Sequence, residues 1–123
     1  MHNKEVLNLR PIGKIDNEIA LKLSKFLNGV LANEFALFTK TLNYHWNITG
    51  PKFNSMHEML ETSYKDLLTK MDSVAERVRV LGETPISTIE NFNRANTLNE
   101  INGEVLSTNQ MIFDLFKSNI QIQ

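Results

Sequence analysis

Four ionisable side chains share one face of a predicted helix, and their types are those that bind metal ions or transfer protons. Around the helix axis, His57, Glu61, Asp72 and Glu76 fall at roughly 0°, 40°, 60° and 100°, given 100° per residue. They therefore occupy a single arc about 100° wide. Such a stripe of charge is usually a solvated helix face, and that interpretation stays open at this point.

Two observations favour a functional site. The arc overlaps the apolar stripe of its own helix instead of lying opposite it, since Tyr64, Leu68 and Ala75 fall within the arc or at its edge. A further histidine, His45, continues the apolar stripe of the preceding predicted helix and so faces a packing surface. A single histidine there is more often a hydrogen-bonded core residue, but this one accompanies four other candidate ligands.

The axial spacing of these residues points to two chains. Fifteen residues separate His57 from Asp72, or about 22 Å along a helix, so one metal ion cannot contact both within one chain. The pair His57 and Glu76 has the same midpoint as the pair Glu61 and Asp72. An antiparallel copy of this helix would therefore form two equivalent sites, with His45 added if its helix packs close. Coincidence is the competing explanation of this symmetry.

The available ligands indicate which metals fit. The chain contains no Cys, so a metal must be held by imidazole and carboxylate groups. Mixed imidazole and carboxylate sets suit iron or manganese, and zinc less exclusively. Without a closed set of thiolates, such a site also leaves coordination positions open for oxidation chemistry.

Four elements must position these residues, and no strand pattern competes with them. We predict a helix over 16–47 with Asp16 as its N-cap, and a second over 56–81 between a capping box at 55–58 and Gly82. A short helix is expected over 88–94, and a third long helical stripe from Leu98 to the chain end. The apolar stripe of the first helix comprises Ile19, Leu23, Phe26, Leu27, Val30, Leu31 and Phe38.

The fold class that follows is all-α, with long helices packed in a bundle. Residues 1–15 are interpreted as an extended arm, and 16–123 as one helical domain, as the length of 123 residues suggests. The net charge of −1 gives no general electrostatic argument for binding nucleic acid or anionic membranes. No stretch has the length of a signal peptide or a membrane span, so the expected location is the cytoplasm.

At these residues the chain resembles the Dps family, the ferritin-like mini-ferritins of starved bacterial cells. The matching motifs are Tyr44-His45-Trp46-Asn47-Ile48-Thr49-Gly50-Pro51, then Phe53, Met56-His57-Glu58, Asp72-Ser73-Val74-Ala75-Glu76-Arg77 and Leu81-Gly82. Weaker similarity extends over 20–95. The spacing from His45 to His57, and then to Asp72 and Glu76, is that of the family.

The resemblance implies a ferroxidase centre between two subunits of a four-helix-bundle protein. His45 and His57 match the two histidine ligands of the family, and Asp72 and Glu76 match the carboxylates that the partner subunit supplies. Glu61 occupies a position where the family often has Asp, and we expect this longer acid to bind or hydrogen-bond iron. By the same resemblance, twelve subunits form a hollow shell. The shell oxidises Fe²⁺, preferably with hydrogen peroxide, stores the ferric mineral and so protects the cell from oxidative damage.

The sequence departs from the family in its last part. Family members usually have a fourth long helix, whereas this chain ends at Gln123, inside or just after the third stripe. We therefore expect the bundle to lack that helix, either in a fragment or in a chain that another chain covers. The face that carries Val105, Ile112 and Phe116 would then have no partner.

Other interpretations remain open at this stage. Trp46 matches a family tryptophan beside the centre, where core packing and electron donation are equally good interpretations. The main alternative function is a nucleoid-compacting DNA-binding shell with incidental metal sites. It is disfavoured because the arm carries only Lys4, Arg10 and Lys14 as Lys or Arg residues, and phosphate affinity follows the number of cations engaged. A structural oligomer with an inactive site is the third possibility.

Overall fold

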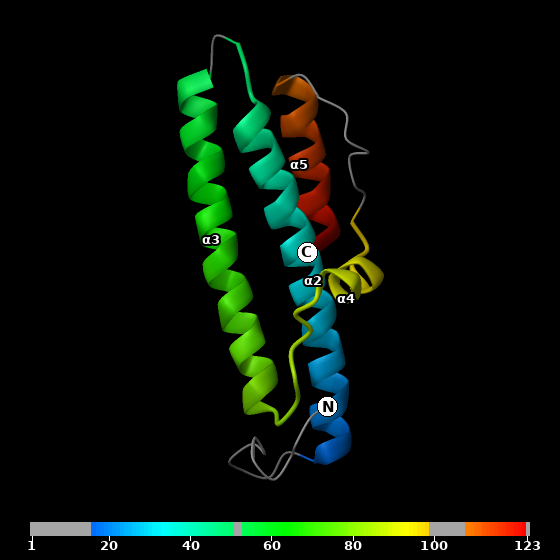
Figure 1. Cartoon of the computed structure of the whole chain (residues 1–123). Helices are drawn as coiled ribbons and strands as arrows, with labels where there is room; N and C mark the ends of the chain where they lie inside the picture. Colours follow the sequence, from blue (N-terminus) through cyan, green and yellow to red (C-terminus); the bar gives the residue numbers. More distant parts are fainter. Residues whose placement is uncertain (1–15, 51–52, 99–107, 123) are drawn as a thin grey trace.

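The computed structural model describes residues 16–50, 53–98 and 108–122. The described part is all-α, with the order α2 (Asn17–Asn47), α3 (Phe53–Val80), α4 (Ile89–Ala95) and α5 (Thr108–Ile122). Figure 1 shows α2 and α3 as a long antiparallel hairpin, with α5 beside the C-terminal half of α2 and the short α4 on its flank. The predicted fold class is confirmed, and the predicted arm over 1–15 lies outside the described residues. No helix in the described part has the length and hydrophobicity that crossing a membrane requires.

Helix α2 begins and ends where the sequence predicts. The Asp16 side chain accepts a hydrogen bond of 3.1 Å from the backbone N–H of Glu18, which satisfies one of the unpaired donors of the first turn. At the other end, Ile48 donates its N–H to the Tyr44 carbonyl over 2.9 Å, and Ile48 itself is extended. Gly50 follows with a positive φ of 100°, which reverses the chain toward α3.

The start of α3 differs from the prediction, whereas its end agrees. The capping box at 55–58 is wrong because the helix already begins at Phe53, whose N–H donates to the Gly50 carbonyl over 3.1 Å. At the C-terminus, Gly82 has a φ of 87°. The N–H groups of Gly82 and Glu83 donate to the carbonyls of Arg79 and Val78. This pair of bonds is the Schellman arrangement that a C′ glycine allows.

The short helix α4 matches the predicted position to within one residue. Its N-cap is Thr88, which accepts the N–H of Asn91 over 3.1 Å, and not the preceding Ser87 of the predicted capping box. Because the box is displaced by one residue, Glu90 does not serve as the capping acid and instead pairs with Arg94 at 2.6 Å.

The third predicted stripe begins too early in the sequence. Leu98 is buried in the core but lies outside any helix, and α5 begins at Thr108. The Thr97 N–H donates to the side chain of Asn33 on α2 over 2.7 Å. The predicted stripe positions Ile101 and Val105 lie outside the described residues. Over 110–118 of α5, where burial is described, Ile112 and Phe116 are exposed as expected, and Met111 and Ser118 are buried.

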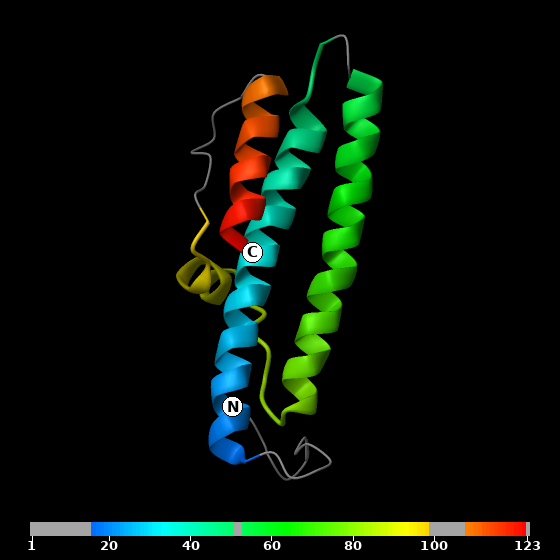
Figure 2. The ribbon, with the colours of Figure 1, turned by 180° about the vertical axis from the view of Figure 1, so that it is seen from behind.

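Helix α2 is the central column of the fold, since α3, α4 and α5 all contact it. Two clusters of buried side chains join the helices, one around Tyr44, Ile48, Leu60 and Met111, the other around Leu37, Leu67 and Leu98. The N-terminal part of the predicted α2 stripe is wrong as core, because Ile19, Leu23 and Phe26 are exposed. Seen from behind in Figure 2, α5 runs beside the C-terminal half of α2 alone, so it cannot cover these turns.

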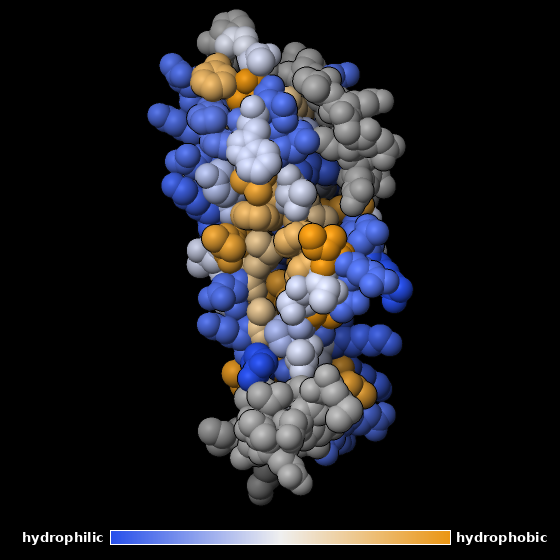
Figure 3. Space-filling view, in the orientation of Figure 1, coloured by the Kyte–Doolittle hydropathy of each residue, from blue (hydrophilic) through white to orange (hydrophobic). Residues whose placement is uncertain are grey.

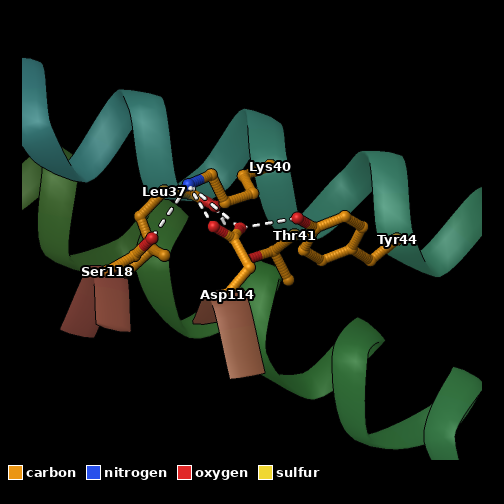
Figure 4. Close-up of polar contacts among 6 residues, drawn as sticks. All are labelled: Leu37, Lys40, Thr41, Tyr44, Asp114 and Ser118. Atoms are coloured by element: carbon orange, nitrogen blue, oxygen red, sulfur yellow. Dashed lines mark hydrogen bonds and ion pairs between the residues drawn. The ribbon is translucent and has the colours of Figure 1, made fainter. Parts of the chain in front are cut away.

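A polar cluster of Lys40, Tyr44, Asp114 and Ser118 connects α5 to α2 (Figure 4). The buried Lys40 ammonium lies 3.0 Å from Asp114 Oδ2 and donates to Ser118 Oγ over 2.9 Å. The hydroxyl of the fully buried Tyr44 donates to Asp114 Oδ2 over 2.5 Å. Every member of this cluster therefore has a partner, as buried polar groups require.

We expect the glycine at the end of α3 to be required for stability, and a glycine inside α2 to be dispensable. Gly82→Ala places a Cβ in the left-handed region and should lower the free energy of unfolding by about 1 kcal/mol. Gly29→Ala is the matched control, because a Cβ at this helical position meets no atom within 4 Å. That change should raise the free energy of unfolding by roughly 0.5–1 kcal/mol. Urea unfolding measures both, and equal effects of the two changes would contradict the assignment of Gly82.

Candidate metal centre

The two predicted histidine ligands meet where α2 ends and α3 begins. His45 lies in the last turn of α2, and His57 lies in the second turn of α3. Their rings stack with centroids 3.7 Å apart and planes inclined by 19°. The tight reversal after Asn47 therefore converts a spacing of twelve residues into direct contact between two imidazoles.

Reciprocal hydrogen bonds orient both rings and indicate which ring nitrogen donates. His45 Nδ1 lies 2.9 Å from the backbone carbonyl oxygen of His57, and His57 Nδ1 lies 3.0 Å from that of His45. A carbonyl can only accept, so we infer that each Nδ1 carries a proton and donates it. In a neutral imidazole, the lone pair then resides on Nε2. A hydrogen bond from the other ring nitrogen is also how metal-binding histidines are usually oriented.

The end of α2 provides one half of this arrangement. The last carbonyls of a helix have no intrahelical donor, and His45 lies within that last turn. The His57 ring supplies a donor to the His45 carbonyl, so the ring also acts as a side-chain cap for α2. The local chain reversal and the orientation of the imidazoles thus have the same origin.

Aromatic side chains enclose the imidazole pair on two further sides. The Phe53 ring stacks on His57 with centroids 4.9 Å apart. Tyr64 meets His45 edge-on at 5.2 Å. The tryptophan beside His45 is different, because Trp46 is 71% exposed and therefore does not pack in the core of this chain. These contacts restrict the rotation of both imidazoles.

The three predicted carboxylate ligands lie along α3, away from a common centre. Glu61 is half-buried and pairs with Lys65 at 3.2 Å, whereas Asp72 and Glu76 are exposed. Within the part of the chain that the structure describes, no three His, Asp or Glu side chains come close enough to hold a metal ion. One chain thus brings together His45 and His57 and leaves the three carboxylates apart from them.

A buried carboxylate that sequence reasoning missed lies further along α2. Glu34 is 8% exposed, and its Oε1 has no hydrogen-bond partner among the residues that the structure describes. Burial raises the pKa of Glu34 above its usual 4.5, and Lys70 partly opposes this shift. The signal was its spacing: Glu34 precedes the buried Leu37 by three residues and the buried Thr41 by seven, so it lies on their helix face.

The polar cluster between α2 and α5 was also missed, although Tyr44 belongs to the motif that contains His45. Burial and the neighbouring Asp114 both raise the pKa of Tyr44 far above its usual 10. The phenol therefore stays protonated and remains a hydrogen-bond donor to Asp114. The sequence gives little sign of this cluster, since a lysine and an aspartate on separate helices read as solvated residues.

We expect the charge of Glu34 to destabilise the folded chain as pH rises. Because its folded pKa is raised, its contribution is favourable below pH 4.5 and is lost as pH rises through the folded pKa. Glu34→Gln should therefore raise the free energy of unfolding by about 1 kcal/mol at pH 8, and by less at pH 5. Urea unfolding at both values tests this, with the exposed Glu58→Gln as control. A stability difference that is independent of pH would contradict it.

Comparison with known proteins identifies the family. A ferritin-like domain model matches residues 24–122. A low temperature-induced protein of Nostoc is 41% identical over 78% of this chain and 54% of its own length. DNA protection during starvation protein 2 of Bacillus anthracis is 35% identical over 60% of this chain and 51% of its own length. The chain spans about half the length of these curated relatives.

Solved structures agree with the family model. The Dps protein of Vibrio cholerae, described as a member of the ferritin-like diiron-carboxylate superfamily, superimposes with a TM-score of 0.85 at 27% identity. The match covers 93% of this chain and 71% of that protein. The chain therefore belongs to the family of ferritin-like domains, and within it to the Dps-type mini-ferritins.

Proposed function

We propose that this protein is a ferroxidase that oxidises Fe²⁺ at sites shared between two copies and stores the ferric product. The observation that carries this proposal is the imidazole pair, whose bonded Nδ1 atoms leave two Nε2 lone pairs for a metal ion. Neutral imidazole suits Fe²⁺ and leaves coordination positions open. The diiron-carboxylate description of the Vibrio cholerae relative supports iron as the substrate.

The carboxylates of a second copy complete the proposed site. Asp72 and Glu76 are exposed on α3, where a neighbouring chain can reach them, and Glu61 follows the His57 face by one turn. Carboxylates stabilise ferric iron better than imidazole does, because they are hard, anionic oxygen ligands. His45 and His57 of one copy would thus hold the ferrous ion, and Asp72 and Glu76 of the other would stabilise the product.

The surface that α2, α3 and α4 share supports pairing of two copies. Figure 3 shows apolar side chains gathered along the middle of this face, between hydrophilic margins. Leu68 is 55% exposed on α3, and the exposed Ile89 borders a groove of about 440 Å³ between α2 and α4. Exposed apolar side chains clustered on one face are typical of interaction surfaces.

The exposed Leu68 and the groove lie at the same level along the hairpin as the midpoint of the α3 ligand pairs. This position supports a two-fold axis at that midpoint. The ring contacts of His45 with His57 and of Phe38 with Tyr64 place residue 36 of α2 beside residue 66 of α3. The midpoint of the α3 ligands and the exposed Leu68 therefore lie at the height of the groove, which Ala32, Phe35, Ala36 and Thr39 line on α2. Isologous pairing needs such a self-complementary patch around the axis.

Assembly and oxidant form the rest of the proposal. Two ferrous ions held close together at one shared site would provide the two electrons that reduce one hydrogen peroxide to the level of water, so peroxide is the proposed oxidant and no hydroxyl radical is released. Two-fold pairs would assemble further into a cytoplasmic shell of twelve copies that encloses the mineral and protects the cell from oxidative damage. DNA binding is not part of the proposal, because the net charge is −1.

The imidazole pair should be required for iron oxidation. We expect His45→Ala/His57→Ala to lower the initial rate of ferric absorbance at least tenfold when the assembled protein receives Fe²⁺ and peroxide. Asp66→Asn is the matched control, because Asp66 lies on the exposed surface of α3 and pairs there with Lys70. Wild-type rates no faster than those of protein-free solution would refute the proposed ferroxidase activity.

Complementation between two inactive variants should show that the site is shared. His45→Ala/His57→Ala and Asp72→Asn/Glu76→Gln are each expected to be inactive alone. Random pairing after co-expression makes half of the dimers mixed, and each mixed dimer has one intact site of two. The mixture should therefore recover about a quarter of the wild-type rate. A mixture as inactive as the separate variants would exclude the shared site, even if wild-type protein oxidises iron.

A further inference from the structure

One carboxylate of α5 fixes two successive turns of α2. Asp114 accepts hydrogen bonds from Lys40 and Tyr44, which are four residues apart and therefore lie one above the other on the same helix face. Figure 4 shows Lys40 and Tyr44 directed toward Asp114 from above, with Ser118 reaching the lysine from the next turn of α5. The carboxylate thus specifies both the height and the rotation of α5 against α2.

The second of these turns leads into the candidate metal ligand His45. Tyr44 directly precedes His45, and its carbonyl accepts the N–H of Ile48 that ends the helix. The last turn of a helix frays easily, because its carbonyls lack intrahelical donors. The Tyr44 ring is fully buried beside Ile48 and Leu60, and its hydroxyl is held by Asp114. Packing and this hydrogen bond together prevent the turn from opening.

Packing alone does not explain why the contact between α2 and α5 is made by polar residues. Apolar residues of similar volume often stabilise a buried contact as well as an ion pair does, because burying charge is costly. Lys40 is only 5% exposed, so the cluster bears that desolvation cost. What hydrogen bonds add is direction, since they hold only over a narrow range of distance and angle. The last turn of α2 needs a defined orientation, because the His45 ring must reach the His57 carbonyl from it.

We propose that Asp114 is a positioning residue for the metal centre. Through Tyr44 it fixes the last turn of α2, and thereby both the His45 ring and the His45 carbonyl that accepts from His57. The proposal rests on the proposed role of the two histidines as metal ligands. Its structural half, that Asp114 keeps the donating proton of each ring on Nδ1, is tested without iron.

Two variants separate positioning from general stability. Asp114→Leu removes the acceptor, and Tyr44→Phe removes only the hydroxyl and keeps the buried ring, so this second variant is expected to fold. Leu67→Ala is the control, because Leu67 belongs to the other core cluster and its loss should destabilise the chain by about 2–3 kcal/mol. All proteins are compared below their unfolding temperatures and in the same oligomeric state.

The first measurement is the protonation of the histidines. Solid-state spectra of protein with ¹⁵N-labelled histidine should show His45 and His57 of the wild type as Nδ1–H forms. Both variants should show a mixture of Nδ1–H and Nε2–H forms, and Leu67→Ala should keep the wild-type pattern. Wild-type spectra for both Asp114→Leu and Tyr44→Phe would overturn the proposal, whatever the protein does with iron.

The second measurement is binding of Co²⁺, used as a spectroscopic probe metal. We expect the dissociation constant to rise at least tenfold in Asp114→Leu and several-fold in Tyr44→Phe, and to change less than twofold in Leu67→Ala. Equal losses in all three variants would assign Asp114 a purely structural role. Absence of Co²⁺ and Fe²⁺ binding in the wild type would instead refute the proposed function, and the histidine spectra would still decide the positioning role.

Discussion

The reciprocal contact between His45 and His57 is the constraint on which the rest of this structure depends. Each ring donates to the other residue's backbone carbonyl, so neither imidazole can turn without breaking its own hydrogen bond. The contact holds the end of α2 against the start of α3 and, in neutral rings, leaves the lone pair of each imidazole on Nε2. The helices must therefore end and begin within a narrow range of positions, and the extended Ile48 and the positive φ of Gly50 meet that requirement.

Helix α2 connects the imidazole pair to the rest of the fold, because the other described helices all contact it. Its C-terminal half is surrounded by α3, α4 and α5, and this half contains His45. Its N-terminal turns leave apolar residues such as Phe26 exposed, because α5 does not extend that far. The best-packed part of the fold is thus the part that orients the imidazoles. Sites that require accurate geometry are held best on rigid, well-packed elements.

Local signals in the sequence predicted most helix ends, because a single residue can decide them. Asp16 as N-cap and Gly82 as C′ residue are such cases, since a side-chain acceptor or a positive φ acts alone. The start of α5 was missed because its predicted stripe was weak, and Leu98 is buried from a non-helical segment. Spacing predicted His45 and His57 as partners, but their mutual hydrogen bonds depend on tertiary packing. The burial of Glu34 and Lys40 was also missed. Charged residues are rarely buried, so their types predicted exposed positions.

The positions of the imidazole and carboxylate ligands along the hairpin mean that the proposed iron chemistry requires two chains to pair. Both imidazoles lie where α2 ends and α3 begins, whereas Asp72 and Glu76 lie four to five helical turns beyond His57 along α3. A continuous helix cannot bend back over that distance, so no rearrangement within one chain can bring Asp72 and Glu76 to the two imidazoles. A metal ion that needs the imidazoles together with these two carboxylates can bind only to paired chains. Binding of the metal and pairing of the chains must then strengthen each other, because a ligand stabilises the state that binds it.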